Sequence, residues 1–561
     1  MKYIPQTIGG LFSSKIQFYI PVYQRAYAWD KANWKTFLED IQESSRHENN
    51  YSYGSILLKT IEQESKYDII DGQQRITTLI LFMRAMINVL NKRNDANEMG
   101  DFIEELVEDY IVKKGKLRLE VVEYDRDCFR AVVSEGRDTY TPNSPSQSQI
   151  IAAINYFESE LEPLDTDALK HICQTINKTD ITRIELDGEK EAALMFELQN
   201  NRGKDLTNLE KLKSYFMYQM YVYSESDETE GNIETLSNTF KEIYRLINDI
   251  KKLNGMTEDS ILIYHCNAYL NKAFGYRNLN DIKDELKGSV EKVSWIINFV
   301  RELKDSFEAI KKCQNSKSYY RQKLFKLGTG AYVFPFIIKG YKYFNDAEMD
   351  DVYKVLEIMS FRDKLVHSRA DFSSRLSDAI RTFDGCITTF IDCVKRVFEN
   401  EWHWSYKRMK DQLNGYMYGN DTLRYILWEY EESIQNKGYK IGTCVLESEQ
   451  IEHISPQTPP EGEVIANGYD VQVSGQYSEE FISDYLNCIG NLMLISGSHN
   501  ASIGNSSFKD KLTSYNKNPI LNQQAEIETF LENNIIEWKI QHIEKRKNVI
   551  VEFALKRWSL D

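Results

Sequence analysis

The chain has 561 residues, of which 42% are hydrophobic and 27% charged, and its formal net charge at pH 7 is −16. The length exceeds what one hydrophobic core supports, so we expect several domains, and the composition excludes a disordered or fibrous protein. The acidic balance argues against a protein that coats DNA nonspecifically, but it is compatible with a confined basic groove for nucleic acid.

The N-terminal part combines short strands with helices. Residues 16–29 and 53–61 have the alternating, aromatic or β-branched pattern of strands, and a further strand at 66–72 ends in an Asp-Gly turn. The apolar run from 76 to about 90 predicts a buried helix, and 101–180 is predicted helical around a polar loop at 134–149. A strand at 181–188 precedes two helices over 190–221, which are broken near Arg202 and Gly203.

The middle of the chain is predicted to be helical. From about 230 to 435, apolar residues recur at the i, i+3 and i+4 spacing of amphipathic helices. The Pro- and Gly-rich loop at 455–468 opens a last segment predicted as strand, loop, strand, helix and terminal helix. This order predicts an α+β multidomain protein with an all-helical middle.

The cysteine pattern and the apolar runs bear on the compartment. The eight cysteines form no C-x-x-C pair, which favours free thiols in a reducing cytoplasm over a zinc knuckle. The chain opens on no basic-plus-apolar leader and has no apolar run long enough to span a bilayer. We therefore expect a cytoplasmic protein with no membrane partner.

Three short C-terminal segments carry side chains suited to phosphodiester hydrolysis. Glu452 and His453 are adjacent on a short apolar strand, Asn491 starts a second strand, and Asn500 follows where a helix begins. Carboxylate and amide oxygens suit Mg²⁺ or Mn²⁺, and a histidine can act as the base for the attacking water. Because neighbours on a strand face opposite sides, Glu452 and His453 reach one site only if the backbone bends there.

This arrangement resembles the HNH nuclease (ββα-metal) family. The resemblance implies that Glu452 is a metal ligand and His453 the general base. It also implies that Asn491 holds the His453 loop in place and that Asn500 is the second metal ligand.

Other side chains in this region leave alternatives open. His499 could replace Asn500 as a ligand, although the spacing favours Asn500, and Lys509 and Lys511 are weaker candidates for phosphate contacts. The competing interpretation is a hydrogen-bonded core histidine, His453, with asparagines that serve only in turns.

A polar corner lies where the strand at 66–72 passes into the buried helix. Its residues are Asp71, Gly72, Gln73, Gln74 and Arg75. A guanidinium binds phosphate oxygens through two N–H groups, glycine lets the backbone approach, and a helix N-terminus offers free N–H groups. The corner therefore predicts an anion site, most simply for phosphate; a turn with a salt-bridged arginine is the alternative.

Two further segments combine amides with an arginine. PVYQRAYAW, at 21–29, places Gln24 and Arg25 among aromatic residues, and FELQNNRGKDL, at 196–206, places Arg202 at a helix break. Each segment alone also fits a buried strand or an ordinary break between helices. The chain has no G-x-x-x-x-G-K-[ST] signature, so any NTPase activity would not be of the P-loop kind.

Taken together, these pieces resemble the N-terminal domain of the GmrSD-type, modification-dependent (type IV) restriction family, which has a ParB/sulfiredoxin-like fold and SspE-like relatives. That family carries P-x-Y-Q-R-x-Y-x-W, D-G-Q-Q-R and F-E-x-x-N-x-R-G-x-x-L motifs, followed by a C-terminal HNH-type domain with E-H-x-x-P and G-N-L. All of these motifs occur here in order, and they bracket roughly 1–220 and 400–561.

The resemblance implies three domains and a set of site residues. They are a ParB-like nucleotide-binding and DNA-modification-sensing domain at 1–225, a helical connector at 226–400 and an HNH-type nuclease domain at 401–561. Contact with modified DNA would involve Tyr23, Gln24 and Arg25. The implied nucleotide-binding residues are Asp71, Gly72, Gln73, Gln74, Arg75, Glu197, Asn200, Arg202 and Gly203.

The sequence thus predicts a modification-dependent DNA endonuclease of anti-phage defence. Its cofactors would be Mg²⁺ or Mn²⁺ and a nucleoside triphosphate, whose binding or hydrolysis regulates cutting. The resemblance implies that the DNA carries either phosphorothioate or glucosylated or hydroxymethylated bases. An apolar pocket with amides suits sulfur and aromatic rings suit a sugar face or a flipped base, and the sequence does not decide between them. The alternatives are a nucleotide-gated sensor that binds modified DNA without cutting it and an RNase-like toxin; a homodimer is left open.

Overall fold

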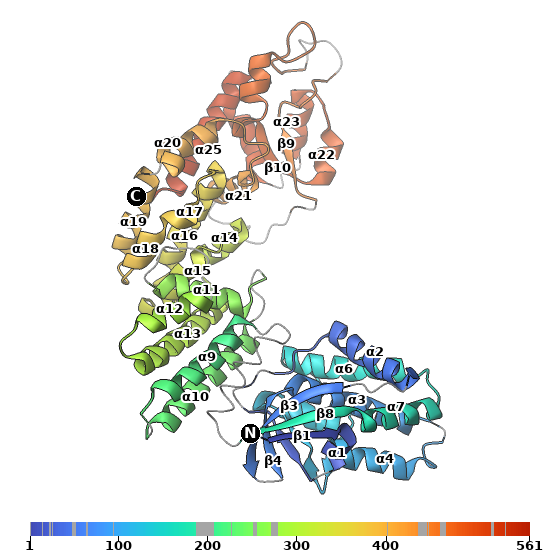
Figure 1. Ribbon diagram of the computed structural model, residues 1–561. Coiled ribbons are helices and arrows are strands. Elements are labelled where there is room, and N and C mark those ends of the chain that lie inside the picture. The colour runs from blue at the N-terminus through green and yellow to red at the C-terminus, as the bar shows by residue number, and fades with distance from the viewer. Residues whose placement is uncertain are drawn as a thin grey trace. The chain divides into compact units, whose positions relative to one another are not determined.

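The computed structural model describes residues 2–13, 15–21, 24, 26–47, 52–62, 65–93, 95–137, 139–186, 207–225, 227–250, 255–270, 279–400, 402–435, 446, 448–460, 467–517, 521–532 and 535–560. The protein is α+β, as the sequence pattern predicted: most elements are helices, and a mixed sheet lies in the N-terminal part (Figure 1).

The chain divides into two compact units. Unit 1 comprises Met1–Ile263 and Arg277–Gln314, and unit 2 comprises Tyr264–Tyr276 and Asn315–Asp561. The helices of the expected connector, 226–400, are therefore shared between the two units. The three-domain division stays a prediction.

Unit 1 is built on a six-stranded sheet of order β1-β8-β3-β4-β2-β7. β8 pairs antiparallel with β1 and parallel with β3, while β4 is antiparallel to β3 and parallel to β2. The strands are β1 (Lys2–Thr7), β2 (Gln17–Tyr19), β3 (Ser52–Glu62), β4 (Lys66–Asp71), β7 (Leu119–Glu120) and β8 (Asp180–Leu186); a separate pair joins β5 (Val112–Lys113) to β6 (Lys116–Leu117).

Helix α3 (Gln73–Asn91) forms the centre of the unit 1 core. Every residue from Ile76 to Ile87 is buried, as expected for a helix that is almost entirely apolar around its circumference. Its Phe82 ring lies edge-on to Phe37 and Phe157, with ring centroids 5.6 and 5.2 Å away. The other helices around this core are α1 (Ile8–Ser13), α2 (Lys31–His47), α4 (Gly100–Leu106), α6 (Pro145–Leu161) and α7 (Thr166–Lys178).

A run of helices follows the sheet. Helix α9 begins at a capping box in which the Thr207 and Glu210 side chains each bond the other residue's backbone N–H. The boundary between the two units falls within α11. These helices are α9 (Asn208–Tyr223), α10 (Thr229–Asp249), α11 (Glu258–Tyr269), α12 (Leu279–Gly288) and α13 (Lys292–Asn315).

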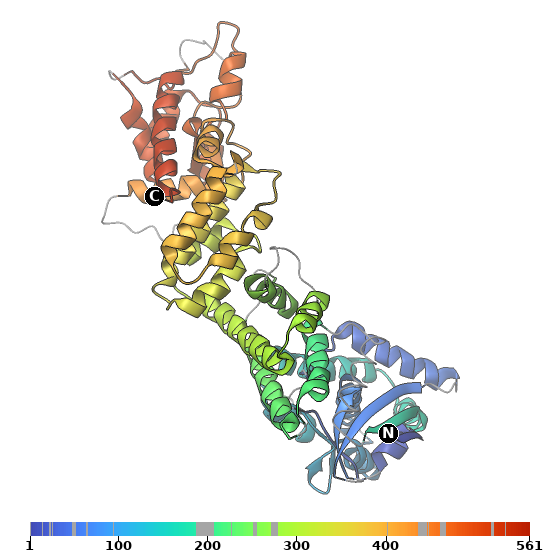
Figure 2. The same cartoon turned by 60° about the vertical axis from the view of Figure 1, so that its left-hand side comes forward.

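Unit 2 joins its helices to the C-terminal segment through a buried contact. Trp558 stacks on Phe361 at 3.6 Å between ring centroids, and its indole N–H donates to Glu357. The segment of unit 2 from residue 315 onward can be followed from yellow-green to red in Figure 2. Its helices up to residue 434 are α14 (Tyr319–Leu327), α15 (Val333–Tyr343), α16 (Met349–Val366), α17 (Phe372–Arg375), α18 (Ser377–Thr382), α19 (Ile387–Asn400), α20 (Tyr406–Asn414) and α21 (Leu423–Ile434).

The C-terminal part of unit 2 has the strand, strand, helix order expected from the sequence. β9 (Gln450–His453) pairs antiparallel with β10 (Leu492–Ile495), and α22 (Gly497–Ile503) follows directly. Helices α23 (Phe508–Lys517), α24 (Asn522–Ala525) and α25 (Ile540–Arg557) complete it. This segment positions the residues that the HNH resemblance singled out.

The sequence led us to expect free thiols and no apolar run long enough to span a bilayer. The seven cysteines among the described residues have free thiols, and six of them are buried. Within the described ranges, the helices are all too short or too polar to cross a bilayer.

Candidate active site

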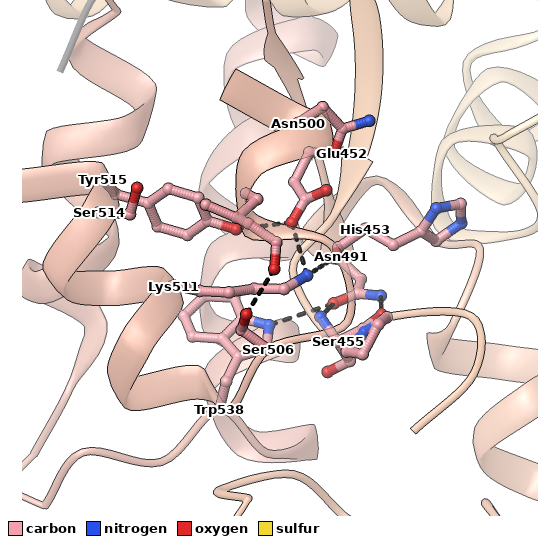
Figure 3. A network of polar contacts seen from close by, with 12 residues as sticks. Glu452, His453, Ser455, Asn491, Asn500, Ser506, Lys511, Ser514, Tyr515 and Trp538 are labelled. Carbon is pink, nitrogen blue, oxygen red and sulfur yellow. Dashed lines mark hydrogen bonds and ion pairs between the residues drawn. The ribbon is translucent and has the colours of Figure 1, made fainter. Parts of the chain in front are cut away.

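Strand β9 directs its two candidate residues to opposite sides. His453 pairs with Leu492 and Glu452 with Met493, so the strand is regular here and successive side chains alternate. Figure 3 shows Glu452 turned toward Lys511 and Tyr515, and His453 turned away from them. The bend that would let both side chains reach one site is not present.

The Glu452 carboxylate lies in a buried polar network. Its Oε1 accepts hydrogen bonds from Lys511 Nζ at 2.6 Å and from Tyr515 Oη at 2.8 Å. Glu452 is only 4% exposed and Lys511 only 1%. Burial raises the pKa of the Glu452 carboxyl, and the Lys511 and Tyr515 hydrogen bonds offset part of that rise. Lys511 is therefore a partner of Glu452 and not a surface contact for phosphate.

The His453 imidazole is held in one orientation. Its Nε2 lies 3.1 Å from Asn487 Oδ1, and because that oxygen can only accept, Nε2 carries the hydrogen and Nδ1 is left as the basic nitrogen. The Tyr418 ring lies against the imidazole with centroids 4.5 Å apart. Burial lowers the pKa of His453, so the ring is neutral near pH 7 and able to take up a proton.

Asn491 holds the segment that follows His453. Its Oδ1 accepts from the Ser455 N–H at 2.8 Å, and its Nδ2 donates to the Ser455 carbonyl at 3.1 Å and to the Leu486 carbonyl at 2.9 Å. The Trp538 indole also donates to Asn491 Oδ1. The side chain is fully buried and acts on His453 through the backbone, so it is a positioning residue.

Asn500 and His499 differ in what they contact on α22. His499 bonds Ser514 and Gln524 inside the fold, whereas Asn500 donates through Nδ2 to Gln450 Oε1 at 2.6 Å. Of the two, only Asn500 lines the cavity that lies beside β9.

This cavity has a volume of about 600 Å³. It lies beside β9, and its wall includes Tyr418, the residue that covers the His453 ring. Other lining residues are Asn420, Arg424, Gln450, Ile451 and Asn500. A substrate in the cavity would therefore lie against the Tyr418 ring that covers the candidate base.

Among the described residues, no complete set of ligands for a divalent cation surrounds Glu452. Glu452 Oε1 already accepts two hydrogen bonds, and the ammonium of Lys511 supplies positive charge beside it. Asn500 bonds Gln450, which lies on the same face of β9 as Glu452, and Figure 3 shows Asn500 beside Glu452. No group of three His, Cys, Asp or Glu side chains within the described ranges could hold a metal ion. His453 faces away from Glu452 and Asn500, so the expected convergence of all three side chains on one ion is absent from this arrangement.

In unit 1 the predicted anion corner is closed by its own side chains. Arg75 donates to the carbonyl oxygens of Tyr53 at 2.8 Å and Ser55 at 2.7 Å, and it lies 3.6 Å from the Asp71 carboxylate. Gly72 has a φ of 92°, which favours glycine, and it precedes α3 without a capping side chain. The guanidinium thus fastens β3 to α3, as in the alternative interpretation, while the first turn of α3 lies beside it.

The amides of this region also join neighbouring segments. Gln74 donates to the Ala26 carbonyl and accepts from the Ala28 N–H, and Gln24 donates to the Ile70 carbonyl. Gln73 is buried in the same turn. Tyr23, Arg25, Glu197, Asn200, Arg202 and Gly203 lie outside the described residues.

A second cavity, of about 660 Å³, adjoins this region in unit 1. It lies where β2 and β7 end, and its wall carries charges of both signs from Lys59, Asp68, Glu123 and Arg126. Pro21 also lines it, and the Pro21 carbonyl accepts from the Gln24 N–H. The backbone of Gln24, a residue expected to contact modified DNA, is therefore anchored at the cavity edge, while its side-chain amide bonds the Ile70 carbonyl.

Several site residues were missed from the sequence. Asn487, Tyr418 and Tyr515 contact His453 or Glu452 across 34 to 63 positions of the chain. A partial signal existed for Asn487, which lies four residues before Asn491 in LNCIGNL. Nothing local to Tyr418 or Tyr515 indicates that their rings reach β9.

Comparison with known protein families agrees with this architecture. Residues 8–217 match the model of the GmrSD restriction endonuclease N-terminal domain, and residues 403–553 match that of the GmrSD restriction endonuclease C-terminal domain. No curated protein matches the chain. The two matches cover more than half of the chain and contain the anion corner and the His453 site respectively. The chain therefore belongs to the GmrSD-type restriction endonuclease family.

Proposed function

We propose that the chain is a modification-dependent DNA endonuclease of anti-phage defence, in which His453 is the general base. The observation that carries the proposal is the state of the imidazole: Asn487 holds Nε2, burial keeps the ring neutral, and Nδ1 is the basic nitrogen. A base that is neutral at working pH and fixed in orientation is what water activation requires. The family membership supplies the restriction nuclease role.

In the proposed step, water attacks phosphorus as its proton passes to His453 Nδ1. The new P–O bond forms while the bond to the leaving sugar oxygen breaks, and that oxygen takes a proton from solvent. Asn491 keeps His453 in position through the Ser455 backbone, and Lys511 does so by donating to the His453 carbonyl at 2.9 Å. These two contacts fix the end of β9 from both sides.

A divalent cation, Mg²⁺ or Mn²⁺, remains our expectation from the HNH resemblance. When bound, such an ion supplies positive charge at the developing oxyanion. Because Lys511 holds the Glu452 carboxylate in the arrangement described here, no step above depends on the ion.

For unit 1 we propose regulation by a nucleoside triphosphate and recognition of modified DNA. The first turn of α3, which follows Gly72 without a capping side chain, supports phosphate binding there, because a helix N-terminus attracts anions. The cavity at Pro21 supports contact with modified DNA next to Gln24. Arg75 would contribute by shaping the corner, since its N–H groups are bonded to β3 carbonyls.

The buried ion pair between Glu452 and Lys511 favours a second candidate function. A nuclease-like domain whose carboxylate is neutralised by lysine could bind modified DNA without cutting it and leave cleavage to another protein. This candidate keeps the unit 1 proposal and drops the role of His453.

The decisive experiment compares wild type with His453→Ala. Plasmids with and without phosphorothioate or glucosylated hydroxymethylcytosine are incubated with and without nucleotide and Mg²⁺ or Mn²⁺. We expect the variant to cut modified DNA at least about 100-fold more slowly, the range for loss of a general base. His171→Ala, which alters an exposed histidine on α7 of unit 1, away from the His453 site, is the matched control.

The outcomes separate the two functions. Equal cutting by His453→Ala and wild type would remove His453 from the mechanism. Stoichiometric binding of modified DNA by wild type, without turnover under any of these conditions, would establish the second candidate instead.

A further inference from the structure

The cavity beside β9 has the chemistry of a nucleobase site. It holds about 600 Å³, and Tyr418 separates it from His453. A substrate that presents a phosphodiester to His453 must place a neighbouring nucleotide near this cavity. Which part of the DNA substrate this cavity binds is therefore a question that rests on the proposed function.

The aromatic residues beside the cavity are held in place by the buried residue between them, Met417. Met417 is fully buried, and its N–H donates to the carbonyl of Asn487, the residue that orients His453, at 2.9 Å. Tyr416 and Tyr418 flank it and are 55% and 40% exposed. A fixed, exposed ring beside a catalytic group is a platform on which a base can stack.

The polar part offers one donor and one acceptor side by side. Asn500 Nδ2 bonds Gln450 Oε1, which leaves Gln450 Nε2 as a donor and Asn500 Oδ1 as an acceptor; within the described part of the chain neither atom has another hydrogen-bond partner. Amide pairs of this kind match the donor and acceptor edge of a nucleobase.

The charges of the cavity argue against phosphate as its occupant. Arg424 is the cation in the wall, and its guanidinium donates to Glu449 Oε1 at 2.8 Å. Asp421, also in the wall, is an exposed carboxylate. A phosphate group favours unpaired cations, whereas an uncharged heterocycle is suited to one aromatic ring and two amides.

We propose that this cavity binds an unstacked nucleobase of the DNA substrate, adjacent to the bond that is cut. The base stacks on Tyr418, and its edge bonds Gln450 and Asn500. Tyr418 is thereby a residue that contacts substrate, and the cavity helps to set which nucleotide sequence or modified base is cut.

The test is a double-mutant cycle in which the Tyr418 ring and one DNA base are removed separately and together. DNA binding is measured with the full-length chain in a His453→Gln background, which prevents cutting and keeps a side chain beneath Tyr418. Oligonucleotides carry a single abasic position, scanned across the cleavage site that wild type defines. The ring variants are Tyr418→Ala and Tyr418→Phe, and Tyr406→Ala is the matched control, because Tyr406 is 54% exposed on α20 and does not line the cavity.

We expect Tyr418→Ala to weaken binding about 5- to 100-fold, the range for loss of one stacked base, whereas Tyr418→Phe and Tyr406→Ala bind like the background protein. One abasic position should weaken binding by a similar factor, and the two losses should not add.

Four results would overturn the inference while leaving the nuclease proposal intact. The first three are equal binding by Tyr418→Ala and Tyr418→Phe, an abasic scan that shows no sensitive position, and additive losses at every position. The fourth is a Tyr418→Ala variant that loses binding to free ATP but binds DNA like the background protein, since the occupant would then be a free nucleotide. If wild type cuts no DNA at all, the nuclease proposal itself fails.

Discussion

Replacement of Lys511 by methionine should destabilise the C-terminal part of unit 2 and spare unit 1. The Lys511 ammonium lies 2.6 Å from the Glu452 carboxylate in a site where the residues are 1% and 4% exposed. At an effective dielectric constant of about 20, this attraction amounts to roughly 6 kcal/mol. It offsets a desolvation cost of several kcal/mol for each ion, so the net value of the intact pair is small.

The loss in the free energy of unfolding appears when one member of the Lys511–Glu452 pair is removed. Lys511→Met leaves a buried carboxylate with only the Tyr515 hydroxyl as partner, and the expected loss in the free energy of unfolding is about 3 to 5 kcal/mol. Glu452→Gln in the same chain removes the uncompensated charge, so the double variant should recover most of that loss. Lys509→Met changes an exposed lysine on the same helix and is the matched control.

Hydrogen exchange measured by mass spectrometry is the appropriate assay, because a chain with two compact units has no single unfolding free energy. Peptides that cover β9 and α23 should exchange faster in Lys511→Met than in Lys509→Met, and peptides from α3 should be unchanged. Equal protection in the two lysine variants, or a double variant less stable than Lys511→Met, would refute the reasoning.

Three further predictions concern other buried contacts. Gly54→Ala should destabilise unit 1 more than Gly115→Ala in thermal unfolding: both glycines have positive φ, but a Cβ at Gly54 would lie 2.4 Å from Arg75 Nη1, whereas at Gly115 it meets nothing within 4 Å. Asn491→Ala should cost about 3 kcal/mol of stability, because it leaves buried partners without hydrogen bonds, and its effect on cutting should be a lower rate with unchanged DNA binding. Burial lowers the pKa of His265 from 6.5 to about 3, so between these two pH values the unfolded chain binds a proton that the folded chain does not. The free energy of unfolding should therefore fall as the pH drops below about 6.5, by roughly 1.4 kcal/mol per pH unit. His265→Leu should flatten this slope in unfolding scans at about pH 4 to 7.

Much of the fold follows from patterns between neighbours in the chain. The strands predicted at 53–61 and 66–72 correspond to β3 and β4, and the strand at 181–188 to β8. The apolar run from 76 marked α3, although the helix begins three residues earlier, at Gln73, so the polar corner forms its first turn. Alternation, helical periodicity and turn residues are local signals, and the elements that obey them can be predicted.

The partners of the site residues could not be predicted in this way. Glu452 contacts Lys511, 59 positions later, and His453 contacts Asn487, 34 positions later. These pairings depend on which face of β9 meets α23 and which meets the loop before β10, and that choice is made by packing across the whole unit.

By itself, the sequence determined the family, the α+β class and the order of strand, strand and helix around His453, because motif spacing and periodicity are properties of the chain alone. Only the tertiary structure decided that Glu452 is paired with a buried lysine, that Arg75 fastens β3 to α3 and that Tyr418 stands between His453 and a cavity. The physical reason is that the charge state and accessibility of a side chain depend on the residues packed around it, and these come from distant parts of the chain.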